Sequence, residues 1–152
     1  MKNLVDFKNI NRRAILSTFW IFVLLNVIFR DIHELFRPRY LQEIVTGTAN
    51  GRVISDGQLL VAGIFLELTI VMVILSRVLS YRANRWANII VGVLSVIFIL
   101  TNGVNDLDDL FFAIVEVTAL AVIVVLAWRW PERKGQAPIG ESRSVMIPTA
   151  GE

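Results

Sequence analysis

Two glutamates, Glu67 and Glu116, each lie inside an apolar run that is long enough to cross a membrane. The runs Leu59–Leu79 and Leu110–Trp130 reach the length of about 20 residues that a helix needs to span a bilayer. No water is available there for backbone polar groups, so such a run must be helical. A carboxylate at this depth is costly and faces a bundle interior, a partner or a water-filled cavity. The chain is therefore constrained to be a membrane protein, and the two glutamates are its first candidate site residues.

Two shorter apolar runs, Ala14–Phe29 and Ala87–Leu100, raise the number of predicted spans to four. We predict an all-α protein with an antiparallel bundle of four transmembrane helices. The bundle fills residues 1–130, with spans at about 13–36, 58–79, 83–102 and 109–130, an outer loop at 37–57, and a disordered cytoplasmic tail at 131–152. The step Arg37-Pro38 predicts the end of the first helix, because the residue before proline is pushed out of helical geometry. Ser55 and Gln58 predict a capping box that opens the second span.

Composition excludes several classes of function. Charged residues make up 18% of the chain and cysteine is absent, whereas a soluble domain carries about 25% charged residues. Without cysteine there are no disulfides, thiolate metal sites or cysteine nucleophiles. The sequence also lacks a phosphate-binding loop, a nucleophile triad and a basic patch for nucleic acid. We therefore assign no cofactor, no metal and no nucleic-acid partner.

The basic residues predict the orientation of the bundle. One side carries Lys2, Lys8, Arg12, Arg13, Arg77, Arg82, Arg85, Arg129, Arg133, Lys134 and Arg143. The opposite side carries only Arg30, Arg37, Arg39 and Arg52. Because lysine and arginine favour the cytoplasmic side, we expect both termini in the cytoplasm and the 37–57 loop outside.

The third span carries a stripe of small and polar residues. Its members recur every three or four positions: Asn84, Asn88, Gly92, Ser95, Ile99, Asn102 and Asp106. Residues with this spacing share one helical face. Such a face in a membrane helix usually marks a helix–helix contact. The alternative is that its outer end, near Asn102, forms the wall of a polar cavity.

A second set of polar residues lies at the outer end of the first span. Asn26, Arg30 and His33 are spaced four and three residues apart, with Asp31 and Glu34 beside them. Both glutamates of the other spans fall in the outer half to the middle of the membrane. We predict an outward-facing polar pocket, with Arg30 as the counter-charge of the glutamates. Arg30 could alternatively pair with Glu34, one turn along its own helix. The predicted pocket residues are Glu67, Glu116, Arg30, Asn26, Asn102, His33 and Asp31, with Asn26 and Asn102 as hydrogen-bond partners.

Three functions compete for this pocket. The first is noncatalytic, namely binding or passage of a small solute or a proton. The second is an accessory or scaffold protein whose polar core only sets packing. The third is a lipid-modifying or metal-dependent enzyme, although a carboxylate–histidine site in a bundle uses Glu-x-x-His on each of two helices and this chain has one histidine. We lean away from an enzyme, and expect the lipid bilayer, a second copy of the chain and a small solute as partners.

Several stretches resemble a bacterial family of small four-span membrane proteins known only as a domain of unknown function. They are Asn11–Ala14, Ser17–Phe22, Leu75–Leu79, Tyr81–Asn88, Phe111–Ala113 with Glu116, and Trp128–Trp130. The resemblance extends up to Trp130 and implies four spans. We expect the protein in the bacterial cytoplasmic (inner) membrane. The architecture alone is also similar to that of DoxX-like membrane proteins. Neither likeness implies an activity, because a fold does not determine a function.

Overall fold

The computed structural model describes residues 2–49, 52–101 and 107–131. Its elements are α1 (Lys2–Leu35), α2 (Pro38–Val45), β1 (Thr48–Ala49), β2 (Arg52–Val53), α3 (Asp56–Val78), α4 (Tyr81–Thr101) and α5 (Leu107–Trp128). Four helices are long and apolar enough to cross a membrane: α1 from Asn11 onward, α3, α4 and α5. The predicted all-α fold with four transmembrane helices is confirmed. Asn102, Asp106 and positions 132–152 of the predicted tail lie outside the described residues.

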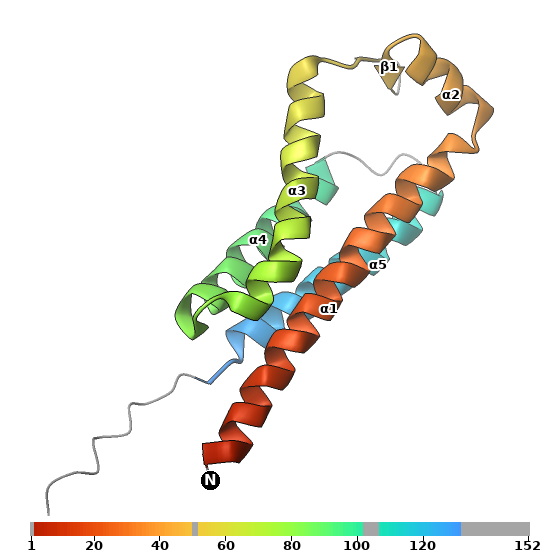
Figure 1. Ribbon diagram of the computed structural model, residues 1–152. Helices are drawn as coiled ribbons and strands as arrows, with labels where there is room; N and C mark the ends of the chain where they lie inside the picture. Colours follow the sequence, from red (N-terminus) through yellow and green to blue (C-terminus); the bar gives the residue numbers. More distant parts are fainter. Residues whose placement is uncertain (1, 50–51, 102–106, 132–152) are drawn as a thin grey trace, which may run out of the picture.

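The four long helices form a ring in which each helix packs against two neighbours. Within the described ranges the neighbouring pairs are α1 with α3, α3 with α4, α4 with α5, and α5 with α1, whereas α3 does not pack against α5. Figure 1 shows α2 and the small hairpin at one end of the bundle and the N-terminus at the other. We call these the loop end and the terminal end. The turn between α3 and α4 also lies at the terminal end (Figure 1).

Local sequence signals explain where α2 and α3 begin. Ser55 Oγ accepts a hydrogen bond from the Gln58 backbone N–H, and Gln58 Oε1 accepts one from the Ser55 N–H, at 3.3 and 3.0 Å. The predicted capping box is therefore confirmed, and it satisfies backbone donors that the first turn of α3 would otherwise leave free. At the other side of the loop, Arg37 is extended with ψ 119° and Pro38 begins α2. Proline suits this position because its fixed φ is helical and its missing N–H is not needed there.

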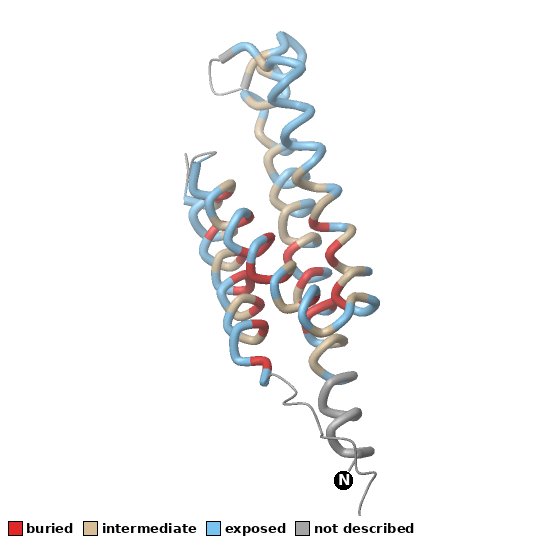
Figure 2. Tube along the Cα trace, turned by 90° about the vertical axis from the view of Figure 1, so that its left-hand side faces the viewer, coloured by how far each residue is buried: buried red, intermediate tan, exposed pale blue. Residues whose placement is uncertain are grey.

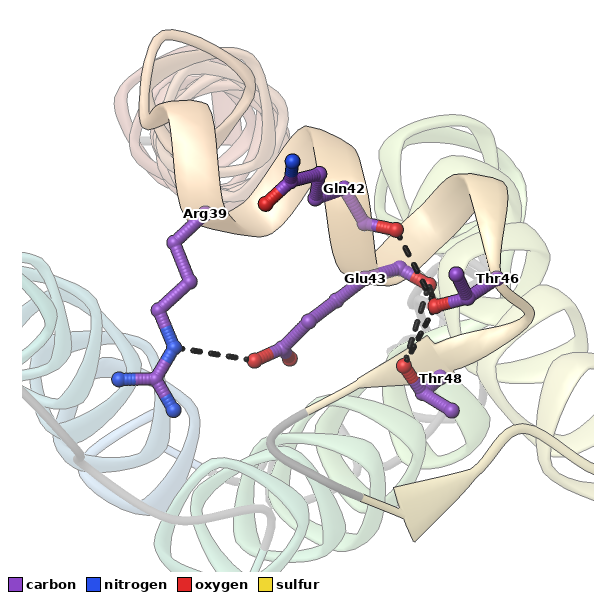
Figure 3. A network of polar contacts seen from close by, with 5 residues as sticks. All are labelled: Arg39, Gln42, Glu43, Thr46 and Thr48. Atoms are coloured by element: carbon purple, nitrogen blue, oxygen red, sulfur yellow. Dashed lines mark hydrogen bonds and ion pairs between the residues drawn. The ribbon is translucent and has the colours of Figure 1, made fainter.

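The loop folds back on itself through threonine hydroxyls, as Figure 3 shows. Thr46 Oγ1 donates to the carbonyl oxygen of Glu43 at 2.9 Å, and Thr48 Oγ1 donates to the same oxygen at 3.2 Å. Arg39 Nε lies 3.2 Å from Glu43 Oε1, one turn apart on α2. These contacts tie the β1–β2 hairpin to the end of α2. The 37–57 loop thus contains a short helix, α2, at Pro38–Val45.

Tight packing is concentrated toward the terminal end. The buried apolar side chains include Leu16, Trp20, Val23, Met72, Leu120 and Ile123. Figure 2 shows buried segments gathered in that part of the bundle, while the loop-end half of α3 is exposed. The structure is therefore firmly packed at the terminal end and more open near the loop.

The predicted stripe on the third span faces its neighbours. Asn84, Asn88, Gly92, Ser95 and Ile99 of α4 are all buried. A side chain at Gly92 would place its Cβ 2.8 Å from Val124 Cγ2 of α5, which is too close for two carbon atoms. The stripe is a helix–helix contact, as predicted, and glycine at this position lets α4 and α5 approach each other.

Candidate functional site

A buried polar network joins three helices in the terminal half of the bundle. Asn88 Oδ1 accepts hydrogen bonds from Trp20 Nε1 of α1 at 2.7 Å and from Ser76 Oγ of α3 at 3.2 Å. Asn88 Nδ2 donates to Asn84 Oδ1 at 2.6 Å, and Asn84 Nδ2 donates to the Ser76 carbonyl oxygen at 2.6 Å. All four side chains are fully buried. Because these donors and acceptors serve one another, the network fixes helix packing and offers no free group to a ligand.

A second set of polar contacts joins the helices closer to the terminal end. Ser17 Oγ donates to the Val73 carbonyl oxygen at 2.8 Å and accepts from Arg77 Nε at 2.9 Å. Tyr81 Oη donates to the Trp130 carbonyl oxygen at 2.6 Å. The sequence prediction selected Asn84 and Asn88 but missed Ser17, Trp20 and Ser76. A signal existed in the spacing of three between Ser17 and Trp20, which puts both polar groups on one face of α1.

Glu116 lies at the centre of the candidate site, in the loop-end half of the bundle. Its side chain is 0% exposed, and its Oε2 lies 3.1 Å from Arg30 Nη1 of α1. The predicted pairing of Arg30 with Glu116 is confirmed, so Arg30 does not take the alternative i,i+4 partner. The other oxygen, Glu116 Oε1, is buried and has no hydrogen-bond partner in the part of the chain that the structure describes. A buried acceptor without a donor is uncommon and calls for an explanation.

A belt of charged side chains lies above this pair, toward the loop. Asp108, in the first turn of α5, forms an ion pair with Arg37 and lies 3.6 Å from His33 Nε2. Asp31 and Glu34 add acidic charge from α1. The acids at the start of α5 are favoured by the positive end of its helix dipole. Acidic side chains therefore lie on the loop side of Glu116, together with Arg37 and His33.

Tyr40 of α2 connects the loop to this belt. Burial raises the pKa of Tyr40 above its ordinary value, and the nearby Glu34 carboxylate raises it further. Both effects disfavour the phenolate, since burial penalises charge and a like charge repels it. The neutral hydroxyl of Tyr40 is thus retained beside Glu34.

Glu67 does not join this site. It is exposed on α3, and α3 does not pack against the helix that carries Glu116. The reason is helical phase. The buried side chains of α3 include Thr69, Met72 and Ser76, and at about 100° per residue these positions lie 140–200° around the helix from Glu67.

The remaining predicted site residues divide into three groups. His33 and Asp31 lie in the charged belt, and both are exposed. Asn26 was predicted to bond to the glutamates. Its Nδ2 instead donates to the Phe22 carbonyl oxygen of its own helix at 2.9 Å. Asn102 lies outside the described residues. The structure thus joins Arg30 and Glu116 and leaves Glu67 and Asn26 elsewhere.

Comparison with known proteins places this architecture in a family. A family model described as a family of unknown function, DUF6326, matches residues 2–136. The chain belongs to this family. No curated protein and no solved structure matches the chain.

Over residues 2–49, 52–101 and 107–131, no group of three or more His, Asp or Glu side chains is arranged to hold a metal ion. Glu116 already shares one oxygen with a guanidinium, which would repel a cation. The chemistry that this arrangement offers is a single buried carboxylate oxygen able to accept a proton or a hydrogen bond.

Proposed function

We propose that this membrane protein is noncatalytic and binds a proton or a small hydrogen-bond-donating solute at Glu116. The single observation that carries the proposal is the buried, unpartnered Glu116 Oε1. A group in this state costs free energy until a donor reaches it. Arg30 holds the opposite oxygen at 3.1 Å, so a bound donor would meet a carboxylate whose orientation is already set.

The surroundings favour entry from the loop end. The site lies in the less densely packed half of the bundle, below the charged belt of His33, Arg37 and Asp108. On the terminal side of Glu116, the same face of α5 carries Leu120, Ile123 and Ala127, which are fully buried. On this face of α5 a proton or polar solute would find no hydrogen-bonding group, and the polar groups of the neighbouring helices at this end are already bonded to one another. Binding from one side is therefore better supported than passage through a single chain.

The proposal also includes an orientation of the protein in the membrane. We place it in a bacterial inner membrane, with both termini in the cytoplasm and the loop end outside. Support comes from the basic residues at the terminal end, which include Arg12, Arg77 and Arg129, since arginine and lysine are enriched in cytoplasmic segments. Glu116 would then lie in the outer half of the membrane.

The scaffold function is a second candidate because of the network around Asn88. That network is buried, fully paired and shared by three helices, which suits a protein whose polar core only fixes its shape. A scaffold would need no ligand at Glu116 and would instead co-purify with a partner protein.

Thermal unfolding of the purified protein in detergent tests the proposal. The probes are guanidinium, small alkylammonium ions and small alcohols, added one at a time to wild type, Glu116→Gln and Glu43→Gln. Glu43 is a matched control because it lies on α2 and pairs with Arg39. We expect at least one probe to raise the Tm of wild type and Glu43→Gln but not of Glu116→Gln. If every probe shifts all three proteins equally, solute binding at Glu116 is wrong.

Passage is tested separately in proteoliposomes. A pH-sensitive dye inside the vesicles reports proton entry under an imposed gradient. The apolar face of α5 below Glu116 predicts no flux above that of empty vesicles. If wild type shows proton flux and Glu116→Gln does not, the proposal of one-sided binding is wrong and the protein transports protons.

A further inference from the structure

The outward face of α3 carries a carboxyl group in the middle of the membrane. Glu67 is eleven residues from Asp56 and eleven from Val78, the two ends of the helix. At 1.5 Å per residue this places it about 16 Å from each end, at the centre of the span. Its side chain is exposed and has no hydrogen bond or ion pair with any residue that the structure describes. Acyl chains offer a carboxyl group nothing to bond with, so its partner lies outside the part of this chain that the structure describes.

The surface around Glu67 has the pattern of a helix–helix interface. We define the α3 stripe as Leu60, Gly63, Ile64, Glu67, Ile70 and Ile74, all of which are exposed. Leu60, Glu67 and Ile74 are seven residues apart, and Gly63 and Ile70 fall three residues after the first two. This is the a and d spacing of helices that pack side by side. A Cβ added at Gly63 would meet nothing within 4 Å in this chain, so the glycine is not required by packing inside the bundle.

Other features of α3 agree with a missing neighbour. It is the least buried of the four spans, and positions 57–64 are exposed on every side. The one basic side chain of the helix, Arg77, turns toward α1 and donates to Ser17 Oγ. The stripe itself therefore presents no cation to Glu67 and no positive charge that would repel an identical surface.

We propose that the α3 stripe is the contact between two copies of this chain, with their Glu67 carboxyl groups bonded to each other. Two copies inserted in the same orientation are related by a twofold axis along the membrane normal. This symmetry brings each residue of the stripe opposite itself at equal depth. One carboxyl, carrying a proton taken from water, donates its O–H to an oxygen of the other. Gly63 lets the two backbones approach one turn away, as small residues do in membrane helix pairs.

A second copy of the chain supplies a hydrogen-bond partner for Glu67, namely its own Glu67 carboxyl group. Arg30, the basic residue nearest the bundle interior at this end, is already committed to Glu116. Identical depth is automatic for a second copy, whereas a different protein would need a polar group placed at the same level. The carboxyl pair thus explains why an acid occupies the centre of an otherwise aliphatic surface.

Thiol cross-linking in native membranes tests the contact, because the natural chain has no cysteine. Leu60→Cys and Ile74→Cys report on the stripe, and Ile90→Cys is the control. Ile90 lies near the middle of α4 and is 53% exposed. We expect the two stripe reporters to give several-fold more cross-linked dimer than the control. Equal yields at all three positions would overturn the proposal.

A second change in the Ile74→Cys protein tests the role of Glu67. Glutamine keeps the ability to bond across the axis and leucine does not. Loss of the bond weakens association by on the order of tenfold, so Glu67→Leu should reduce the cross-link several-fold while Glu67→Gln keeps most of it. Because Glu67 faces outward, neither change should lower the melting temperature of the monomer in detergent. A cross-link that survives Glu67→Leu unchanged would contradict the carboxyl pair.

Discussion

Replacing Asn88 by leucine should destabilise the bundle through two lost contacts between helices. Asn88 Oδ1 accepts from Trp20 Nε1 at 2.7 Å and from Ser76 Oγ at 3.2 Å. Each such bond between membrane helices contributes about 0.6–2 kcal/mol, so the loss of both amounts to about 1–4 kcal/mol. Leucine has the same branched shape as asparagine and is somewhat larger, so the substitution leaves no cavity and removes the two bonds. The free energy of unfolding is measured by SDS titration in mixed micelles, followed by circular dichroism.

A double-mutant cycle separates the bond to Trp20 from other effects. Trp20→Phe removes the indole N–H, and the coupling energy between Trp20→Phe and Asn88→Leu should be about 0.5–2 kcal/mol. Asn26→Leu is the matched control, since the hydrogen bond of Asn26 among the described residues is to its own helix. We expect a change of about 0.5 kcal/mol or less. A coupling energy near zero, or equal costs at positions 88 and 26, would refute the assigned role of the network.

Three further outcomes follow from the packing and the charges. Gly92→Ala should cost about 1–3 kcal/mol of unfolding free energy because its Cβ would lie 2.8 Å from Val124 Cγ2, and adding Val124→Ala should recover part of it. Arg30→Gln should cost about 3–5 kcal/mol by leaving Glu116 buried and unpaired, and the double variant with Glu116→Gln should cost less. Burial and a nearby carboxylate raise the pKa of Tyr40, so the stability that its neutral form contributes should be lost as pH rises from the ordinary tyrosine pKa through this raised value. The difference in phenolate absorbance between wild type and Tyr40→Phe should accordingly appear above the pH at which a free tyrosine titrates.

Features that depend on local spacing could be predicted from the sequence. The Ser55–Gln58 capping box and the buried face of α4 each follow from residues three or four positions apart, which a helix brings together whatever its neighbours are. The pairing of Arg30 with Glu116 could also be anticipated. Both residues lie at similar depth in their spans, and a buried carboxylate needs a counter-charge.

Features that depend on the order of helices around the ring could not be predicted. Nothing in the sequence states that α3 and α5 lie on opposite corners, so Glu67 and Glu116 were expected in one pocket. The orientation of Glu67 had a partial signal, since Thr69 and Ser76 are small polar residues on the opposite face of α3. The polar network at Trp20 was missed because its members come from three helices, and only their packing brings them within hydrogen-bond distance.

Infrared spectroscopy of Glu116 tests the central claim most directly. The measurement compares wild type and Glu116→Gln in lipid over a range of pH and follows the carbonyl band of a protonated carboxylic acid. We predict that one component of this band changes with pH in wild type and is missing from Glu116→Gln, because Glu116 Oε1 takes up the proton. Identical spectra for the two proteins at every pH would show that Glu116 exchanges no proton, and proton binding at this site would be contradicted.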